Sequence, residues 1–473
     1  MPAKSKLRLY AEEILRCVDV LENDCSSRGV AVPDLDDPSP IHPNNDNDFD
    51  RNAKSVTDAL NSLTTTGMLL NQSISNPVQS VRIAACGYIV SASLRCAAEL
   101  HVVDLLRIAG PQGLHVDDLA VKCGVEPGHL AQILHLLSSQ GIFRESAPDV
   151  FTNNRLSVVF DKGLTQKELD GKPKGHDVLY KNPESAACAL FCHLTDEPAK
   201  STSYLYEALL ESKSPSPPTA FSKAFNTELF EYYELPGQEN RLRRFNLAQE
   251  GAARVEPEDA IIKGFDWESI ANGGHVVDVG GGVGAVSLRV AEAYPEINIV
   301  IQDRQGVVDD ALKRCSAINP TAVQRGKLKF EAHDFFTPQP IKNPDVFVIK
   351  SIVHDWPDSS CLTILRQLRE AAGPKTRLFA VDKIIPYTCD TESSETDGIT
   401  FLGPATGETK SGLGHVLSYL PSVLMISVLN GQERSLKHTV SLYRKAGWEI
   451  YKIYQSESQG QFASQMEARP IGA

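Results

Sequence analysis

The stretch HVVDVGGGVGAVSLRVA, residues 275–291, decides the fold. A buried strand pattern leads into a run of glycines, and a helix begins directly after them. Because glycine has no Cβ, a ligand can approach such a turn closely. Taken alone the motif is ambiguous, since Gly280, Gly282 and Ala285 also fit the G-x-G-x-x-A signature of dinucleotide-binding enzymes.

Strands and helices alternate around this stretch from about residue 255, which is typical of a doubly wound α/β sheet. We expect strands at 275–279, 298–302, 327–332, 346–349 and 377–381, and a final pair formed by 448–454 and a segment near the C-terminus. A polar loop at 387–414 interrupts the domain, and its residues indicate no function.

Carboxylates near the glycines bear on the kind of ligand. Asp278 stands just before them, where it suits a cationic amino-acid moiety better than a pyrophosphate. Asp303 ends the next expected strand, where a carboxylate can accept hydrogen bonds from both ribose hydroxyls. Asp334, in HDFF after the third strand, is placed to meet an adenine edge.

A second motif is VFVIKSIVHDWPD, residues 346–358, an apolar strand followed by polar residues. It delivers Lys350, His354, Asp355 and Trp356 to the carboxyl end of the strand, where ligands bind in such sheets. A phenol has a pKa near 10 and histidine one near 6.5, so a histidine would accept the proton as the oxygen attacks rather than beforehand. The alternative is that His354 is a structural core histidine whose ring nitrogens are hydrogen-bonded within the protein.

A third motif, LNGQERSLKHTVSLYRKAGWEI, residues 429–450, contains a turn before an amphipathic helix. Read from the residues alone, Glu433 caps this helix and Arg434 lies in solvent.

The first half of the chain has a helical pattern. A helix is expected at 6–21, followed by a polar linker at 23–50 rich in Pro, Asp, Asn and Ser. Within the helical region at 56–109, residues 81–106 are apolar enough to be buried on most sides, which suits a bundle core or a subunit interface.

Two short helices at 115–123 and 127–140, with a hairpin around 147–149, give a winged helix-turn-helix outline. The second helix contains no Lys or Arg for phosphates and base edges, so we expect a scaffold rather than a DNA-binding element. Aromatic residues between 221 and 245 either line a pocket for an aromatic substrate or form ordinary core.

Composition narrows the function classes. The 473 residues carry a net charge of −13, which disfavours a nucleic-acid partner. No stretch approaches the roughly 18 apolar residues of a membrane span, and no signal-peptide pattern opens the chain. Ten scattered cysteines without a Cys-x-x-Cys pair indicate buried thiols in a reducing cytoplasm and no metal site, although Cys188 and Cys192 could share a helix face.

Together the three motifs, in this order, resemble the plant caffeate-type O-methyltransferases and their fungal secondary-metabolism relatives. The likeness runs from about residue 84 to 448 and includes the winged-helix outline, the glycine-rich loop, HDW and NG-x-ER before AGW. It implies a C-terminal Rossmann-like, S-adenosylmethionine (SAM)-dependent methyltransferase domain and an N-terminal, mainly α-helical winged-helix dimerisation domain. We therefore divide the chain into 1–55, a helix and linker; 56–254, the dimerisation domain with substrate-lining helices; and 255–473, the catalytic domain.

The resemblance also implies roles for individual residues. His354 corresponds to the general base and Glu433 to the carboxylate that orients it, while Asp382 stands where plant members have a second acidic partner, a glutamate. SAM-binding positions fall on Asp278, Gly280, Gly282, Asp303, Asp334, Phe335 and Lys350. Substrate-binding positions fall on Phe245, Gln249, Asp355 and Trp356; plant members commonly carry a methionine at the position of Gln249.

The resemblance implies a homodimer that methylates a hydroxyl of a small, phenolic molecule and whose winged-helix region does not bind DNA. Together with the composition, we expect a cytoplasmic enzyme with no membrane or nucleic-acid partner, and the sulfonium of SAM makes a metal unnecessary. Two other interpretations remain: a methyltransferase-like regulator or scaffold without catalysis, and an NAD-type oxidoreductase. The oxidoreductase explains the glycines but leaves HDW and NG-x-ER without a role.

Overall fold

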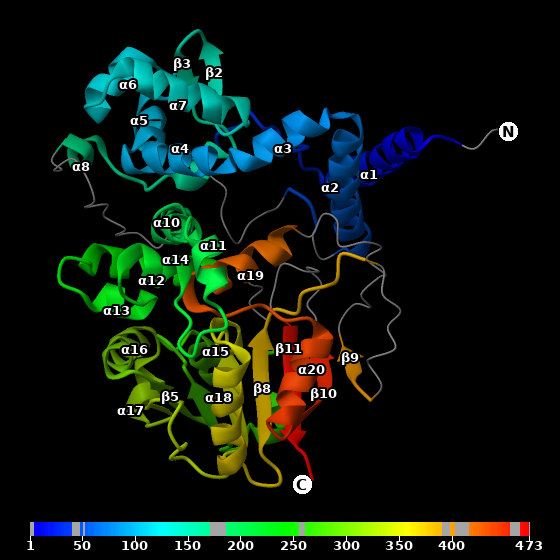
Figure 1. Ribbon diagram of the computed structural model, residues 1–473, viewed down its shortest axis with the longest axis vertical. Coiled ribbons are helices and arrows are strands. Elements are labelled where there is room, and N and C mark those ends of the chain that lie inside the picture. The colour runs from blue at the N-terminus through cyan, green and yellow to red at the C-terminus, as the bar shows by residue number, and fades with distance from the viewer. Residues whose placement is uncertain are drawn as a thin grey trace. The chain divides into compact units, whose positions relative to one another are not determined.

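Figure 1 shows the computed structural model, which describes residues 4–39, 48–50, 53–170, 186–254, 261–389, 398–402, 416–454 and 464–472. The chain divides into two compact units, Met1–Val255 and Glu256–Ala473.

The C-terminal unit is built on one mixed sheet with the strand order β6-β5-β4-β7-β8-β11-β10-β9. The first five strands in this order are parallel, and β11 pairs antiparallel with both β8 and β10. The strands are β4 (His275–Val279), β5 (Asn298–Asp303), β6 (Leu328–Ala332), β7 (Val346–Lys350), β8 (Arg377–Asp382), β9 (Thr400–Leu402), β10 (Trp448–Tyr454) and β11 (Ser464–Pro470). This arrangement confirms the predicted Rossmann-like fold and every predicted strand.

One strand was not predicted. The loop expected at 387–414 contains the short strand β9, which pairs parallel with β10 at the sheet edge. Its signal was missed because three residues are too few to show an alternating pattern. Residues 390–397 and 403–414 of this loop lie outside the described residues.

The strand order creates a switch point next to β4. From β4 the chain passes to β5 and β6 on one side, then returns to β7 on the other side. The carboxyl ends of β4 and β7 are therefore adjacent, at the place where open α/β sheets bind their ligands. The helices of this unit are α15 (Ala285–Ala293), α16 (Gln305–Ile318), α17 (Pro320–Gln324), α18 (Asp358–Ala371), α19 (Val416–Leu429) and α20 (Leu436–Lys445).

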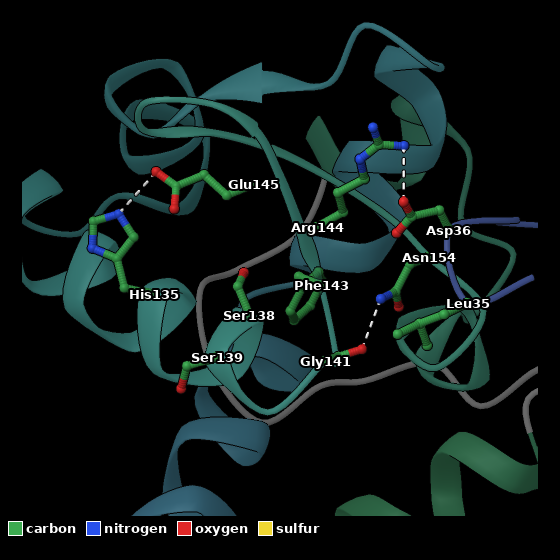
Figure 2. A pocket seen from close by; sticks show the side chains of 10 residues that line it. All are labelled: Leu35, Asp36, His135, Ser138, Ser139, Gly141, Phe143, Arg144, Glu145 and Asn154. Atoms are coloured by element: carbon green, nitrogen blue, oxygen red, sulfur yellow. Dashed lines mark hydrogen bonds and ion pairs between the residues drawn. The ribbon is translucent and has the colours of Figure 1, made fainter.

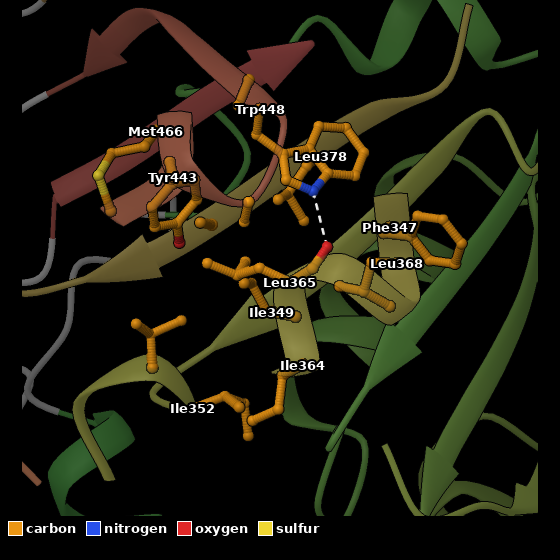
Figure 3. Packing of buried hydrophobic residues seen from close by; sticks show 14 of the residues in the cluster. Phe347, Ile349, Ile352, Ile364, Leu365, Leu368, Leu378, Tyr443, Trp448 and Met466 are labelled. Atoms are coloured by element: carbon orange, nitrogen blue, oxygen red, sulfur yellow. Dashed lines mark hydrogen bonds between the residues drawn. The ribbon is translucent and has the colours of Figure 1, made fainter. Parts of the chain in front are cut away.

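The core between β7, β8, β10, α18 and α20 keeps these strand ends in place (Figure 3). Trp448 and Tyr443 are fully buried, and the Trp448 indole donates a hydrogen bond to the Leu365 carbonyl at 2.9 Å. Burying an aromatic or aliphatic side chain of this kind contributes about 1.5–3 kcal/mol. Trp448 thus ties the start of β10 to α18, whose N-terminus follows the HDW motif.

The N-terminal unit contains the predicted winged-helix outline, with α6 (Val116–Cys123), α7 (Pro127–Ser139) and a three-stranded sheet in the order β1-β3-β2. The strands are β1 (Leu114–His115), β2 (Arg144–Ala147) and β3 (Val150–Thr152). Helix α7 buries Leu130, Leu134 and Leu137. The remaining helices of this unit are α1 (Lys6–Arg28), α2 (Lys54–Ile74), α3 (Pro77–Ala85), α4 (Gly87–Glu99), α5 (Val102–Ala109), η1 (Ser157–Phe160), α8 (Gln166–Asp170), α9 (Ala186–Leu194), α10 (Glu197–Thr202), α11 (Leu205–Leu210), α12 (Ala220–Phe225), α13 (Leu229–Glu234) and α14 (Glu239–Arg254).

The predicted end of the first helix was wrong. Helix α1 continues through the polar residues 22–28 and stops at Gly29, whose φ of 67° is left-handed. Cys17, Leu21 and Cys25 are buried on one face of α1, so packing holds the last turns helical despite their polar composition. The linker therefore begins after Arg28, and residues 40–47 of it lie outside the described residues.

The expectation that residues 81–106 are buried holds only for the second part of that segment. Ala97, Ala98 and 102–106 are buried, whereas Val81, Ile83 and Tyr88 are 69%, 70% and 72% exposed. An apolar surface on α3 and the start of α4 is consequently uncovered in a single chain. Within the described residues no single helix has the length and apolar character to cross a membrane, and only the bent pair α3–α4 meets that test when both helices are taken together.

Candidate active site

The glycine-rich turn follows β4 at the switch point. Gly280, Gly282 and Gly284 have left-handed φ values of 66°, 55° and 80°, a conformation that favours glycine. A Cβ on Gly280 would lie 2.5 Å from Ile352 Cδ1, whereas a Cβ on Gly282 would meet nothing within 4 Å. The backbone at Gly282 therefore faces open space, as a ligand cradle requires.

Asp303 supports this turn from the end of β5. Its Oδ2 accepts a hydrogen bond from the Gly282 N–H at 2.9 Å, and its Oδ1 accepts one from the Arg304 N–H at 2.8 Å. A carboxylate has about four acceptor sites, so these two bonds leave capacity for ribose hydroxyls.

Asp278 is much more enclosed. It is 2% exposed, and its Oδ2 accepts a hydrogen bond from the Ser287 hydroxyl at 2.6 Å. Burial raises its pKa to about 6, outweighing the Ser287 hydrogen bond and the positive charge of Lys350. A cation brought to this position would stabilise the ionised carboxylate.

Aromatic side chains lie on the β6 and β7 sides of the turn. Phe335 lies near Gly280 and is edge-on to Trp356, with ring centroids 6.0 Å apart. Phe336 meets the same indole at 4.9 Å. The exposed Asp334 begins this segment, and its carboxylate accepts a hydrogen bond from the Phe336 N–H at 3.0 Å.

The residues after β7 bring His354 into a short helix, η4 (Val353–Asp355). The Nδ1 atom of His354 lies 2.8 Å from Oε1 of Glu433, and its Nε2 atom lies 3.4 Å from Oδ1 of Asp355. An ionised carboxylate only accepts hydrogen bonds, so Nδ1 carries a hydrogen, and when the imidazole is neutral its lone pair lies on Nε2. The His354 side chain is 21% exposed and Glu433 is buried.

Three carboxyl groups set the electrostatics around this imidazole. Burial alone would lower the pKa of His354, but Asp355, Glu433 and Asp382 raise it to about 10. Burial raises the pKa of Asp355 to about 6 and that of Asp382 to about 7. The imidazolium is therefore well stabilised here, so His354 is a strong proton acceptor whenever its imidazole is neutral.

Asp382 does not hydrogen bond to His354. Both of its carboxylate oxygens are buried and have no hydrogen-bond partner within the described chain. Asp382 thus acts on His354 through its charge alone.

The loop 430–434 holds the backbone that carries His354. A Cβ on Gly431 would lie 2.1 Å from the His354 carbonyl oxygen and 2.5 Å from the Asp355 carbonyl carbon, so only glycine fits this approach. Glu433 bonds the imidazole from the same loop, and the Arg434 guanidinium donates to the Val353 carbonyl at 2.8 Å.

The helix-cap interpretation of this segment was wrong. Ser435, not Glu433, caps α20 by accepting from the His438 N–H, and Arg434 is 4% exposed rather than in solvent. Neither Gly431 nor the buried position of Arg434 was predicted, because both depend on contacts with η4, more than 70 residues away in the chain.

The predicted substrate residues Phe245 and Gln249 belong to the N-terminal unit, on α14. Phe245 stacks on Tyr233 at 5.0 Å and meets the His193 ring edge-on at 5.4 Å. Gln249 is exposed. Arg244, one residue before Phe245, is buried and pairs with Asp196 at 2.9 Å and Glu197 at 2.6 Å, which fixes α14 against α10.

A cavity of about 430 Å³ lies elsewhere in the N-terminal unit, beside α7 and β2 (Figure 2). His135 points toward Glu145 there, with 3.3 Å between Nε2 and Oε1, and Asp149 lies equally close to Nε2. His135 thus contacts both carboxylates, and all three side chains are partly or fully exposed. None of the predicted site residues lines the cavity.

Comparison with known proteins identifies the protein family. The family model for an O-methyltransferase domain matches residues 203–449, and the model for an O-methyltransferase dimerisation domain matches residues 84–163. The chain therefore belongs to the O-methyltransferase family and carries its dimerisation domain.

Individual relatives agree with this assignment. An O-methyltransferase of Armillaria gallica is 33% identical over 96% of both chains, and 4-O-methyltransferase 1 of Phanerochaete chrysosporium is 32% identical over 98% of this chain and 99% of its own. Among solved structures, the mitomycin 7-O-methyltransferase MmcR has the same fold, with a TM-score of 0.63 at 20% identity over 83% of this chain and 97% of its own.

Proposed function

We propose that this chain uses SAM to methylate a hydroxyl of a small phenolic molecule, with His354 as the general base. The 2.8 Å contact between His354 and Glu433, beside the switch point of the sheet, is the observation that carries this proposal. A regulator without catalysis would have no need for a buried carboxylate aimed at that ring.

Nε2 of His354 accepts the proton of the acceptor hydroxyl as the oxygen forms its bond to the methyl carbon. Nδ1 keeps its hydrogen bond to Glu433, which fixes the ring and stabilises the imidazolium. An imidazolium with a pKa near 10 matches a phenol, whose pKa is also near 10, so the proton moves with little free-energy change.

The residues of the C-terminal unit suit the cofactor. Gly282 presents open backbone, Asp303 retains acceptor sites for a ribose, and the enclosed Asp278 favours a positive charge beside it. Bound SAM supplies an activated methyl group through its sulfonium, so this route needs no metal. We also include Phe335, which follows β6, and Lys350, which ends β7, among the proposed SAM-binding residues.

For the acceptor we propose an aromatic ring bound with the help of Phe245, Gln249, Asp355 and Trp356. The solved relative NcsB1, with a TM-score of 0.57 at 20% identity over 80% of this chain and 96% of its own, was crystallised with S-adenosyl-L-homocysteine and 1,4-dihydroxy-2-naphthoic acid. We also propose a homodimer formed through the dimerisation domain, with no nucleic-acid partner.

Mass spectrometry of the purified protein with SAM and a panel of phenols, hydroxybenzoates and aromatic polyketides tests this function. We expect a product heavier by one methyl group together with S-adenosyl-L-homocysteine. Absence of SAM binding by calorimetry would overturn the proposal, whereas binding without any product would favour a regulator.

A further inference from the structure

We propose that Arg434 is a positioning residue that holds His354 and Glu433 in the geometry needed for proton transfer. The inference deepens the proposed function and rests on it for its catalytic meaning. Arg434 is 4% exposed and directly follows Glu433 in the chain.

The Arg434 guanidinium hydrogen-bonds to the backbone on both sides of His354. Its Nη1 donates to the Val353 carbonyl at 2.8 Å, and its Nη2 donates to the Trp356 carbonyl at 2.8 Å. These carbonyls bracket His354 and Asp355, so their position fixes where the imidazole sits.

The guanidinium is itself anchored by Asp358 at the start of α18. Asp358 Oδ1 accepts from Nε of Arg434 at 3.0 Å and from Nη2 at 2.9 Å. Oδ2 of Asp358 lies 2.7 Å from Nε2 of His438 on α20. Burial tends to raise the pKa of Asp358, but the hydrogen bonds from His438 and Arg434 hold it below its usual value, so the anchor is a carboxylate.

The Arg434 backbone reaches the third acidic segment. The Ile385 N–H donates to the Arg434 carbonyl at 3.1 Å, and Ile384 and Arg434 form a parallel β-bridge. Asp382 lies two residues before that bridge. Arg434 thus joins the segments that carry His354, Glu433 and Asp382.

Lysine cannot replace these contacts. A guanidinium presents five N–H donors in a rigid planar fork, whereas an ammonium is a single point on a flexible stem. Arg434→Lys therefore keeps the charge but cannot hold two carbonyls and Asp358 together.

The groups that face the His354 ring are Asp355 on η4, Glu433 on the loop and Asp382 at the end of β8. Because the Glu433 hydrogen bond helps to raise the pKa of His354, misalignment of the pair lowers that pKa. A residue that only stabilised the fold would leave it unchanged.

The test compares Arg434→Lys and Asp358→Asn, which loosens the anchor but keeps the arginine, with Arg369→Lys. Arg369 is a matched control because it also ties carbonyls, donating to Gly447 at 3.1 Å and to Ile471 at 3.2 Å, away from η4. Titration of labelled histidine by NMR, with His354→Ala to identify the signal, gives the His354 pKa. Calorimetry gives SAM affinity, and product formation gives kcat.

We expect both test variants to titrate His354 at lower pH and to lose roughly 100-fold in kcat at unchanged SAM affinity. The Arg369 control should keep the wild-type titration and kcat. A wild-type His354 titration in folded Arg434→Lys and Asp358→Asn would overturn the inference. The NMR titration needs no methyl acceptor. If the wild-type protein transfers no methyl group, the proposed function is contradicted, but the titration still tests whether Arg434 positions His354.

Discussion

At the scale of the residue, the account depends on one imidazole surrounded by carboxyl groups. His354 contacts Glu433 and Asp355 directly and experiences the charge of Asp382 without a hydrogen bond. Asp382 therefore contributes to the raised pKa of His354 through its charge, without a direct hydrogen bond.

The raised pKa of His354 predicts a pH dependence. Only the neutral imidazole accepts a proton, so kcat/KM should rise with pH toward about 10 rather than level off near 7. Glu433→Gln removes the charge that stabilises the imidazolium, and the rising limb should move to lower pH by roughly 1–3 units. Ionisation of the acceptor would be the same in both proteins, so an unmoved limb in a pH–rate profile would contradict the assignment of His354.

Asp303 gives a second prediction at this scale. Asp303→Ala removes both the proposed acceptor for the ribose and the bond to the Gly282 N–H, so SAM should bind more weakly, by about 1–3 kcal/mol. Isothermal calorimetry measures this directly, with the exposed Asp310→Ala as a control on α16. Equal affinity in the two variants would show that the ribose lies elsewhere.

At the scale of the element, the loop 430–434 and η4 work as one unit. Gly431→Ala places a Cβ against the His354 and Asp355 backbone, which can only be relieved by moving η4. Since a shift of about 1 Å can cost roughly 100-fold in rate, we expect a large loss of kcat with little change in SAM affinity. Gly128→Ala is the control for glycine replacement, because this exposed α7 glycine has no left-handed φ and a Cβ there would meet nothing within 4 Å. A fully active Gly431→Ala enzyme would refute the coupling.

The same elements show how far sequence reasoning reaches. The strands around 275–291 were predicted because buried parallel strands form short apolar runs with clear ends. Local sequence pattern alone was enough to place the glycine turn and His354 at the ends of strands. The roles of Arg434 and Gly431 could not be predicted in this way, because they depend on contacts with a segment about 75 residues earlier in the chain.

Packing between elements explains the other differences. Helix α1 continues beyond its predicted end because Cys25, in its last turns, is buried. The polar composition of residues 22–28 does not indicate this burial. Strand β9 forms at the edge of an existing sheet and has too few residues to be recognised by itself.

At the scale of the whole molecule, the exposed apolar side chains of α3 and α4 predict self-association. Val78, Val81, Ile83 and Tyr88 are each at least 69% exposed, and a patch of this kind marks an interaction surface. Val81→Glu combined with Ile83→Glu places charges in that surface and should convert a dimer into monomers. Sedimentation or light scattering measures the mass, with Lys313→Glu on the exposed face of α16 as the control; a dimer that survives the paired change would locate the interface elsewhere.

The most direct test of the central claim is the single-turnover rate of methyl transfer in His354→Ala at saturating SAM. Loss of the base should reduce that rate roughly 10²–10⁴-fold while SAM affinity stays near the wild-type value. His275→Ala, an exposed histidine at the opposite end of β4, should react at the wild-type rate. An unchanged rate in His354→Ala would contradict its assignment as the general base.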